Sequence, residues 1–149
     1  PTLPDTVRVV VELEEGLTVH ADSAQLRQLL WNLVLNAAQA MPDGGELTIH
    51  GAAASEEAPQ EAHSDRRKGG GAKSAWAELC VRDEGVGIPA DLLDRIFDPF
   101  FTTKPQGSGL GLAMVHRIVE EHGGILGVES KVGRGTGIRV RLPLSEASP

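Results

Sequence analysis

Residues 75–89, AWAELCVRDEGVGIP, contain the stretch that decides the fold. The alternation over 75–83 predicts a buried strand, which the turn sequence DEGVGIP follows directly. Asp83 then places a hydrogen-bond acceptor at the end of a strand, beside Gly85 and Gly87, whose backbone another group can approach closely. The amino group of an adenine requires such an acceptor. An ordinary turn is the alternative interpretation of this segment.

The following segment, RIFDPFFTTK at 95–104, belongs to a predicted loop over 97–109, after a short predicted helix at 90–96. Its three phenylalanines can dock the loop as a lid over a ligand. Lys104 can reach a phosphate group as a point charge. The alternative is a loop pinned on the core by its phenylalanines, which Phe97 fits equally well.

The glycine run GSGLGL at 107–112 leads directly into a predicted helix over 110–122. Exposed N–H groups at a helix start, together with the helix dipole, favour the binding of an anion. A dinucleotide-binding fingerprint would need glycine where Leu112 stands and a strand immediately before the run. Because both are missing, the sequence argues against a nicotinamide-dependent enzyme.

A longer helix is predicted over 22–41, with Asp22 as its N-cap. Five neutral amides share one face of this helix: Gln25, Gln28, Asn32, Asn36 and Gln39. The predicted apolar face lies elsewhere and consists of Leu26, Leu30, Leu33 and Ala37. Solvated helix faces usually carry lysine and glutamate, so the amides favour a partly buried polar surface over a solvated one. An asparagine carbonyl oxygen is a suitable ligand for Mg²⁺, and its NH₂ group can donate to phosphate.

The remaining sequence predicts several strands and one long loop. Strands are predicted at 7–13, 17–20, 46–51, 125–130 and 137–142. Residues 52–74 are small, polar and charged, with no periodic apolar face, and we expect them to form a disordered loop inside the domain.

The composition limits the possible functions. A chain of 149 residues with a net charge of −7 predicts one domain and argues against a general nucleic-acid binder, although an anionic small ligand remains compatible. The single cysteine, Cys80, excludes an internal disulfide framework, and we expect a packed core thiol. No apolar run approaches the length of a transmembrane helix. The start, PTLP, has no signal-peptide character and indicates a piece of a longer protein.

Four segments, taken together, resemble the N, G1, F and G2 boxes of the catalytic, ATP-binding domain of sensor histidine kinases in the GHKL superfamily. They are NLVLNA at 32–37, DEGVGIP at 83–89, IFDPFFTTK at 96–104 and GSGLGL at 107–112. Their order and spacing match, and the resemblance covers residues 7–143 except the 52–74 insert. The lid is most similar to that of the nitrogen-regulation sensors. The resemblance implies an α/β (α+β sandwich) Bergerat-type fold, with a mixed sheet and helices packed on one face.

The resemblance also implies roles for individual residues. Asn32 would be the Mg²⁺ ligand, Lys104 would contact the terminal phosphates, and these two would be the catalytic residues. Asp83 would accept a hydrogen bond from the adenine amino group. The full set implied for nucleotide binding is Asn32, Asn36, Asp83, Gly85, Gly87, Ile88, Phe97, Thr103, Lys104, Gly107, Ser108, Gly109, Leu110, Gly111 and Leu112.

The activity implied is transfer of the ATP γ-phosphoryl group to a histidine. Hydrolysing relatives such as DNA gyrase place a glutamate one turn before the first asparagine as a general base. Gln28 stands there in this chain and cannot accept a proton near neutral pH. None of the five histidines has the context of a phosphoacceptor, so we expect the acceptor and dimerisation domain to lie outside this chain.

The resemblance further implies a response regulator downstream, a cytoplasmic location, and a monomeric fragment that contacts neither nucleic acid nor membrane. The alternatives are a GHKL serine kinase or ATPase, and a nucleotide-binding module without catalysis.

Overall fold

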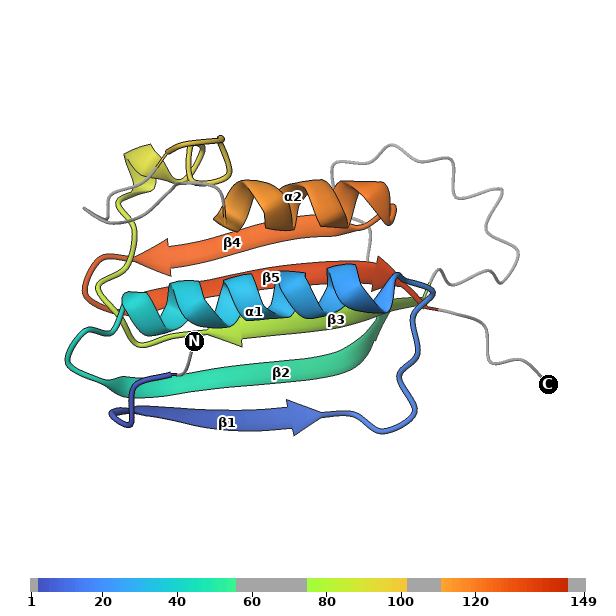
Figure 1. Cartoon of the computed structure of the whole chain (residues 1–149), viewed down its shortest axis with the longest axis horizontal. Helices are drawn as coiled ribbons and strands as arrows, with labels where there is room; N and C mark the ends of the chain where they lie inside the picture. The colour runs from blue at the N-terminus through green and yellow to red at the C-terminus, as the bar shows by residue number, and fades with distance from the viewer. Residues whose placement is uncertain (1–2, 56–74, 102–110, 145–149) are drawn as a thin grey trace.

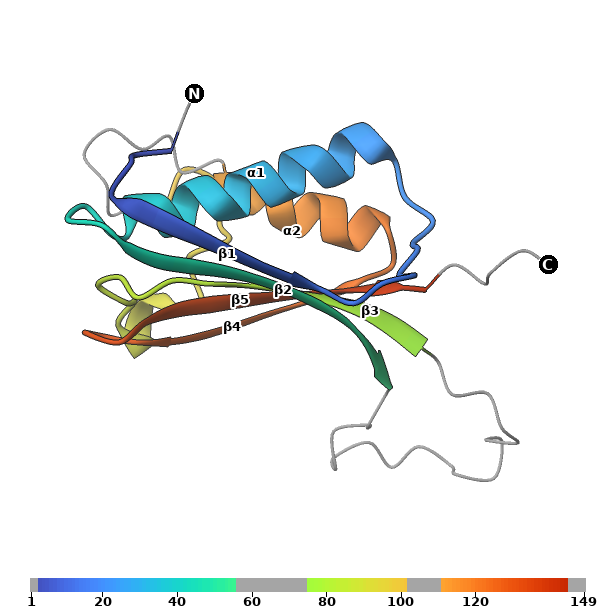
Figure 2. The same cartoon turned by 90° about the horizontal axis from the view of Figure 1, so that it is seen from below.

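A mixed five-stranded sheet forms the centre of the computed structural model, which describes residues 3–55, 75–101 and 111–144. The strand order is β1-β2-β3-β5-β4; β1 and β2 are parallel, and the other neighbours are antiparallel. Two helices of the described part lie on one face of the sheet (Figures 1 and 2). Along the chain the elements are β1 (Val7–Leu13), α1 (Ser23–Gln39), β2 (Gly45–Ser55), β3 (Ala75–Arg82), the 3₁₀ turn η2 (Ala90–Leu92), α2 (Gly111–Glu121), β4 (Ile125–Lys131) and β5 (Gly135–Pro143).

The hydrophobic core lies between the two helices and the facing side of the sheet. Each strand contributes alternate residues, because successive side chains point to opposite faces. The most deeply buried side chains come from both helices and from two strands: Leu29, Leu33, Leu47, Val115, Val119 and Val140. The fold class expected from the sequence is therefore present, with its helices on one side only.

A histidine joins the N-terminal end of α1 to the C-terminal end of α2. Asp22 caps α1 as predicted, since its carboxylate accepts the Gln25 backbone N–H at 3.0 Å. The backbone N–H of Asp22 in turn donates to Nε2 of His122, just beyond α2, at 3.3 Å. The other ring nitrogen, Nδ1, lies 2.7 Å from the Ile118 carbonyl oxygen, which fixes the ring.

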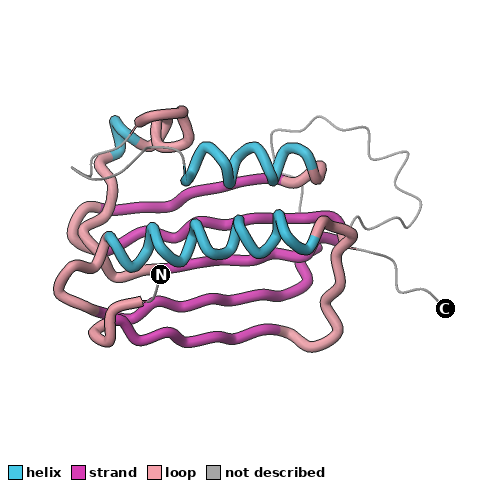
Figure 3. The backbone as a smooth tube through the Cα atoms, viewed as in Figure 1, coloured by secondary structure: helices cyan, strands magenta, loops and turns pink. Residues whose placement is uncertain are grey.

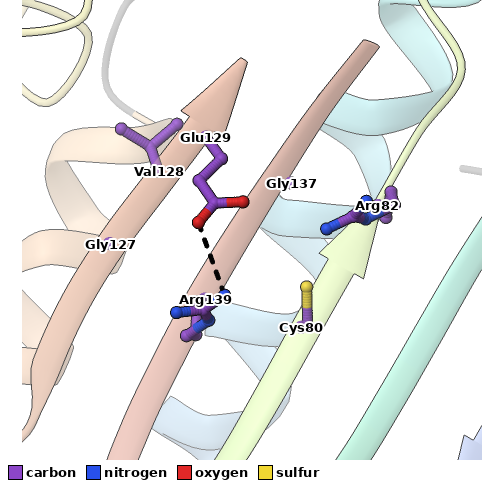
Figure 4. A pocket seen from close by; sticks show the side chains of 7 residues that line it. All are labelled: Cys80, Arg82, Gly127, Val128, Glu129, Gly137 and Arg139. Carbon is purple, nitrogen blue, oxygen red and sulfur yellow. Dashed lines mark ion pairs between the residues drawn. The ribbon is translucent and has the colours of Figure 1, made fainter. Parts of the chain in front are cut away.

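The opposite face of the sheet has no helix on it in the described part of the chain (Figure 2). Cys80 lies on this face, because Leu79 and Val81 on either side of it point toward the helices. The expectation of a packed core thiol is therefore wrong: Cys80 is only half-buried. It lines a shallow hollow together with Arg82, Gly127, Val128, Glu129, Gly137 and Arg139 (Figure 4).

Cross-strand ion pairs cover part of this open face. The Nε atom of Arg141 donates to Glu78 at 2.8 Å, and Arg139 lies 3.5 Å from the same carboxylate. Arg139 also approaches Glu129 at 3.6 Å (Figure 4). Because these groups are partly exposed, solvent screens the pairs, and they set the polarity of the face more than its stability.

Three predicted elements differ from the structure. Residues 17–20 form a loop with a single antiparallel bridge between Val19 and Leu144 rather than a strand (Figure 3). The predicted helix at 90–96 is only the turn η2 followed by further turns. The first four residues of the 52–74 insert belong to β2, where they pair with β3, and residues 56–74 lie outside the described residues. Pairing with a neighbouring strand overrides the weak local preference of an alanine run.

Candidate functional site

Asp83 lies directly after β3 and is 4% exposed. Its Oδ1 atom accepts the backbone N–H of Gly85 at 2.8 Å and that of Thr136 at 3.2 Å. Its own backbone N–H donates to the Thr136 carbonyl oxygen at 2.8 Å. A buried carboxylate is costly unless it is hydrogen-bonded, and these backbone donors both stabilise Asp83 and fix its orientation.

The loop after Asp83 packs against the last turn of α1. Val86 donates its backbone N–H to the carbonyl oxygen of Ala40 at 3.1 Å. A Cβ atom on Gly85 would lie 2.3 Å from that same oxygen, so only glycine fits there. Gly87 has a φ of 77°, and a Cβ there would lie 2.1 Å from the Lys131 carbonyl oxygen. The two glycines are therefore required by the packing of the loop itself.

A second anchor holds the loop on its other side. The backbone N–H of Ile88 donates to Oγ of Ser130 at 2.7 Å. Ser130 Oγ also donates to the Gly135 carbonyl oxygen at 3.1 Å and lies 2.7 Å from the Thr136 hydroxyl oxygen. Sequence reasoning missed Ser130 and Thr136. Thr136 lies between two glycines at the start of a strand, which was the one local signal that could have drawn attention to it. Its contact with Asp83 could not be predicted locally, because the two residues are 53 positions apart in the sequence.

Part of the amide face of α1 turns toward α2. Asn32 is half-buried, and its Nδ2 atom donates to the sulfur of Met114 in α2 at 3.6 Å. Asn36 is also half-buried, whereas Gln28 is exposed. The apolar face differs from the predicted one. Leu26 and Leu30 are only half-buried, whereas three residues outside the predicted face are fully buried: Leu29, Val34 and Ala38.

The segment 97–101, where the predicted lid begins, contacts α2 through an aromatic pair. The ring of Phe97 stacks on His116, with ring centroids 6.2 Å apart, so Phe97 is pinned on the helix. The guanidinium of Arg95 lies 4.9 Å from the centre of the Phe101 ring. Phe100 is exposed and has a φ of 67°, which is rare for a residue with a side chain.

The remaining candidates divide into two groups. Gly111 begins α2 and is exposed, whereas the side chain of Leu112 packs against the core. Thr103, Lys104, Gly107, Ser108, Gly109 and Leu110 lie outside the described residues. The C-terminal end of α1, the start of α2 and the loop after β3 all lie at the same end of the sheet (Figure 1). The candidates at Asn32, Asn36, Asp83 and Gly111 thus come from elements that meet at one end of the fold.

Comparison with known families identifies this arrangement. Residues 21–146 match the family model HATPase_c, described as "Histidine kinase-, DNA gyrase B-, and HSP90-like ATPase". The chain belongs to the HATPase_c family. ATP is accordingly the ligand class of this domain.

Relatives of this HATPase_c domain are sensor kinases. It is 40% identical over 141 residues to the sensory histidine kinase/phosphatase NtrB of Rhizobium leguminosarum bv. phaseoli, covering 94% of the chain and 36% of NtrB. It is 43% identical over 127 residues to the sensor histidine kinase ZraS of Escherichia coli (strain K12), covering 85% of the chain and 23% of ZraS. The chain thus spans about a quarter to a third of the length of these relatives.

A solved structure agrees with the sequence relatives. The mycobacterial sensor histidine kinase MprB matches with a TM-score of 0.72 and 31% identity, covering 93% of this chain and 83% of the MprB chain. These matches confirm the α/β fold of the HATPase_c domain and its histidine kinase type. No helix in the described ranges is long and apolar enough to span a membrane.

Proposed function

We propose that this domain binds Mg²⁺-ATP and donates the γ-phosphoryl group to a histidine on a separate dimerisation domain of its parent kinase. The observation that carries the proposal is the buried carboxylate of Asp83, which two backbone N–H groups hold at the end of the sheet where α1 and α2 meet. The relatives support the transfer to histidine, because NtrB and ZraS are named as histidine kinases.

Asp83 is the residue proposed to recognise adenine. A carboxylate accepts hydrogen bonds only, so it favours the 6-amino group of adenine over the carbonyl oxygen that guanine has at the same position. Gly85 and Gly87 add no side chain to the loop, and the anchors at Ala40 and Ser130 hold it beside Asp83. Specificity for adenine is therefore proposed to depend on one acceptor in a fixed loop.

Asn32 and Asn36 are proposed to serve the metal-bound phosphates. The Asn32 amide nitrogen donates to the sulfur of Met114. The side-chain carbonyl oxygen of Asn32 is therefore the atom proposed to bind the metal. No group of three or more His, Cys, Asp or Glu side chains that could hold a metal ion occurs among the described residues. The neutral side-chain oxygens of Asn32 and Asn36 fit Mg²⁺, which binds few protein ligands and completes its shell with phosphate oxygens and water. When bound, the metal would neutralise charge on the phosphates during transfer.

Gln28 supports a kinase over a hydrolase. It lies on α1 one turn before Asn32 and is exposed. The resemblance to hydrolysing relatives such as DNA gyrase places their general base at this position. An amide has no basic site near neutral pH and cannot take a proton from water. The γ-phosphoryl group is then retained until a better nucleophile arrives, and catalysis consists of positioning and charge neutralisation.

The roles of the lid residues and the partners complete the proposal. Lys104 is proposed to contact the terminal phosphates, with Thr103, Gly107, Ser108, Gly109 and Leu110 around them and Gly111 and Leu112 opening α2. The fragment is proposed to be one cytoplasmic domain that acts with a response regulator downstream of the kinase. It is proposed to contact neither nucleic acid nor membrane.

Phosphotransfer to the dimerisation domain of the parent kinase tests the proposal. The chain is mixed with that domain, Mg²⁺ and γ-labelled ATP, and we expect an acid-labile, base-stable label on a histidine. An acid-stable phosphoprotein would instead indicate a serine kinase. ATP binding without any labelling would indicate a nucleotide-binding module and contradict the proposal.

A further inference from the structure

Strand β1 forms one edge of the sheet, and among the described strands only β2 pairs with it, so from Val9 onward its outer side has no strand partner. In the part of the chain that the structure describes, no segment runs along this outer side (Figures 1 and 2). Edge strands are usually protected by proline, charged side chains, a bulge or a very short length. The sequence of β1, VRVVVEL, has seven residues and no proline, and its two charged residues, Arg8 and Glu12, both lie on the face away from the helices.

From Val9 onward, one face of β1 is apolar and exposed. Val9, Val11 and Leu13 are 40%, 55% and 58% exposed. They point to the same side as their partners on β2, the side on which the helices lie. The helix α1 lies over the middle strands of the sheet and not over β1 (Figure 1), although Val7 at the start of β1 is buried in the core. Three large apolar side chains in a row on an unpaired edge form a surface that favours a further strand.

The other face of β1 carries two opposite charges at symmetric positions. Arg8 and Glu12 are both exposed and flank Val10 at equal distance along the strand. If a second β1 runs antiparallel with the two Val10 residues opposite each other, Arg8 of each copy faces Glu12 of the other. On the apolar face the same alignment places Val9 opposite Val11.

Other alignments lose this match. A two-fold axis at Val9 places Arg8 opposite Val10, and an axis at Val11 places Glu12 opposite Val10. A parallel in-register alignment places Arg8 beside Arg8. Oppositely charged cross-strand pairs are stabilising and like-charged pairs destabilising, so the charges select the axis at Val10.

We propose that a second copy of this chain pairs antiparallel along β1 about a two-fold axis at Val10, which joins two five-stranded sheets into one continuous sheet. The contact is self-complementary, as a two-fold interface must be. It is also small, and the net charge of −7 on each copy opposes it. We therefore expect a weak dimer, in place of the monomeric fragment that the family resemblance implies, with a dissociation constant between about 10 μM and 1 mM.

Charge reversal at the two symmetric positions tests the pairing. Sedimentation of the whole chain is measured from about 10 μM to 1 mM, the range in which a weak dimer forms. We expect R8E and E12R each to weaken dimerisation about tenfold, because two attractive pairs become two repulsive ones. The double variant R8E/E12R restores the opposite pairs and should recover the original dissociation constant.

The matched control is Arg117→Glu, which changes the net charge as R8E does but lies on the exposed side of α2. It should leave dimerisation within about twofold, since charge at a distance is largely screened. Thermal unfolding verifies that each variant is folded. A chain that stays monomeric at every concentration overturns the proposal, and so does a double variant that is weaker than both single ones.

Disulfide trapping tests the axis without any change of charge. In a Cys80→Ser background, V10C places two cysteines opposite each other across the axis, at a separation that a disulfide can bridge. The control V9C places its cysteine opposite Val11 and should cross-link at least about tenfold more slowly. The variant V9C/V11C should cross-link again. Equal cross-linking of V9C and V10C would overturn the proposed alignment.

Discussion

The carboxylate of Asp83 accepts the backbone N–H of Thr136 at 3.2 Å, and the backbone N–H of Asp83 donates to the Thr136 carbonyl oxygen at 2.8 Å. The two residues therefore tie the end of β3 to the start of β5. The proposed adenine acceptor is held by the sheet itself, so changes to its chemistry can be separated from changes to its position.

Replacing Asp83 by Asn separates these two effects. The amide carbonyl can still accept from Gly85 and Thr136, so we expect the free energy of unfolding to fall by only about 1 kcal/mol. ATP affinity should fall more than tenfold, because the group facing adenine becomes partly a donor. Calorimetric titration with ATP measures this. The neighbouring change Glu84→Gln is the control, and equal loss of affinity in both variants would contradict the role of Asp83.

Replacing Ser130 by Ala removes the acceptor of the Ile88 N–H. We expect the free energy of unfolding to fall by about 1–2 kcal/mol, because the partly buried N–H of Ile88 loses its acceptor. ATP affinity should fall several-fold because the loop beside Asp83 loses an anchor. Denaturant unfolding and ATP titration measure the two effects. The control Thr136→Ser keeps the neighbouring hydroxyl and should change neither the free energy of unfolding nor the ATP affinity by much. If S130A had the wild-type free energy of unfolding, the contact between Ser130 and Ile88 would contribute nothing to stability.

Replacing Gly85 by Ala forces a Cβ atom onto the Ala40 carbonyl oxygen, 2.3 Å away. We expect a loss of about 1–3 kcal/mol in the free energy of unfolding, since both groups are backbone-positioned. Gly127→Ala is the matched control, because a Cβ there meets nothing within 4 Å. Chemical denaturation compares the two, and equal stabilities would mean that the loop does not pack on α1 in this way.

Replacing Asn32 by Ala should weaken binding of ATP in the presence of Mg²⁺ about tenfold or more, and in the presence of EDTA much less. The reason is that the carbonyl oxygen is proposed to bind the metal rather than the nucleotide. Titrations under both conditions measure the difference. The control Met114→Leu removes the sulfur that contacts the Asn32 amide but keeps the carbonyl oxygen. Equal losses for N32A with and without Mg²⁺ would refute the metal role.

Replacing Gln28 by Glu supplies a carboxylate one turn before Asn32. We expect steady-state ATP hydrolysis to rise by about tenfold or more, because a general base typically contributes a larger factor than that. Phosphate release reports the rate. Gln39→Glu adds the same charge on the same helix face at its far end and serves as the control. Unchanged hydrolysis in Q28E would show that the amide at this position does not distinguish kinase from hydrolase.

Local signals in the sequence were sufficient for much of the fold. The N-cap at Asp22, the helices, the loop at Asp83 and most strands follow from spacing and turn residues over a few positions. Motif order added the family, which the comparisons confirm. The site residues outside the described ranges, Lys104 among them, stay predictions.

The errors come from information that no local pattern contains. The sequence predicts a core position for Cys80 because it lies in a strand predicted to be buried, yet in the described part of the chain helices cover only one face of the sheet. The sequence predicts a loop for the alanines after position 51, although pairing with β3 makes them part of a strand. Ser130 and Thr136 gain their roles only when the β4–β5 pair lies beside Asp83.

The two anchors of the loop after β3 determine at which step, folding or ligand binding, the loop loses its conformational entropy. Because Ala40 and Ser130 already hold the backbone of Val86 and Ile88, the loop becomes ordered when the chain folds. A purine that binds there contacts a loop that is already ordered, so none of its binding free energy is consumed in ordering the loop.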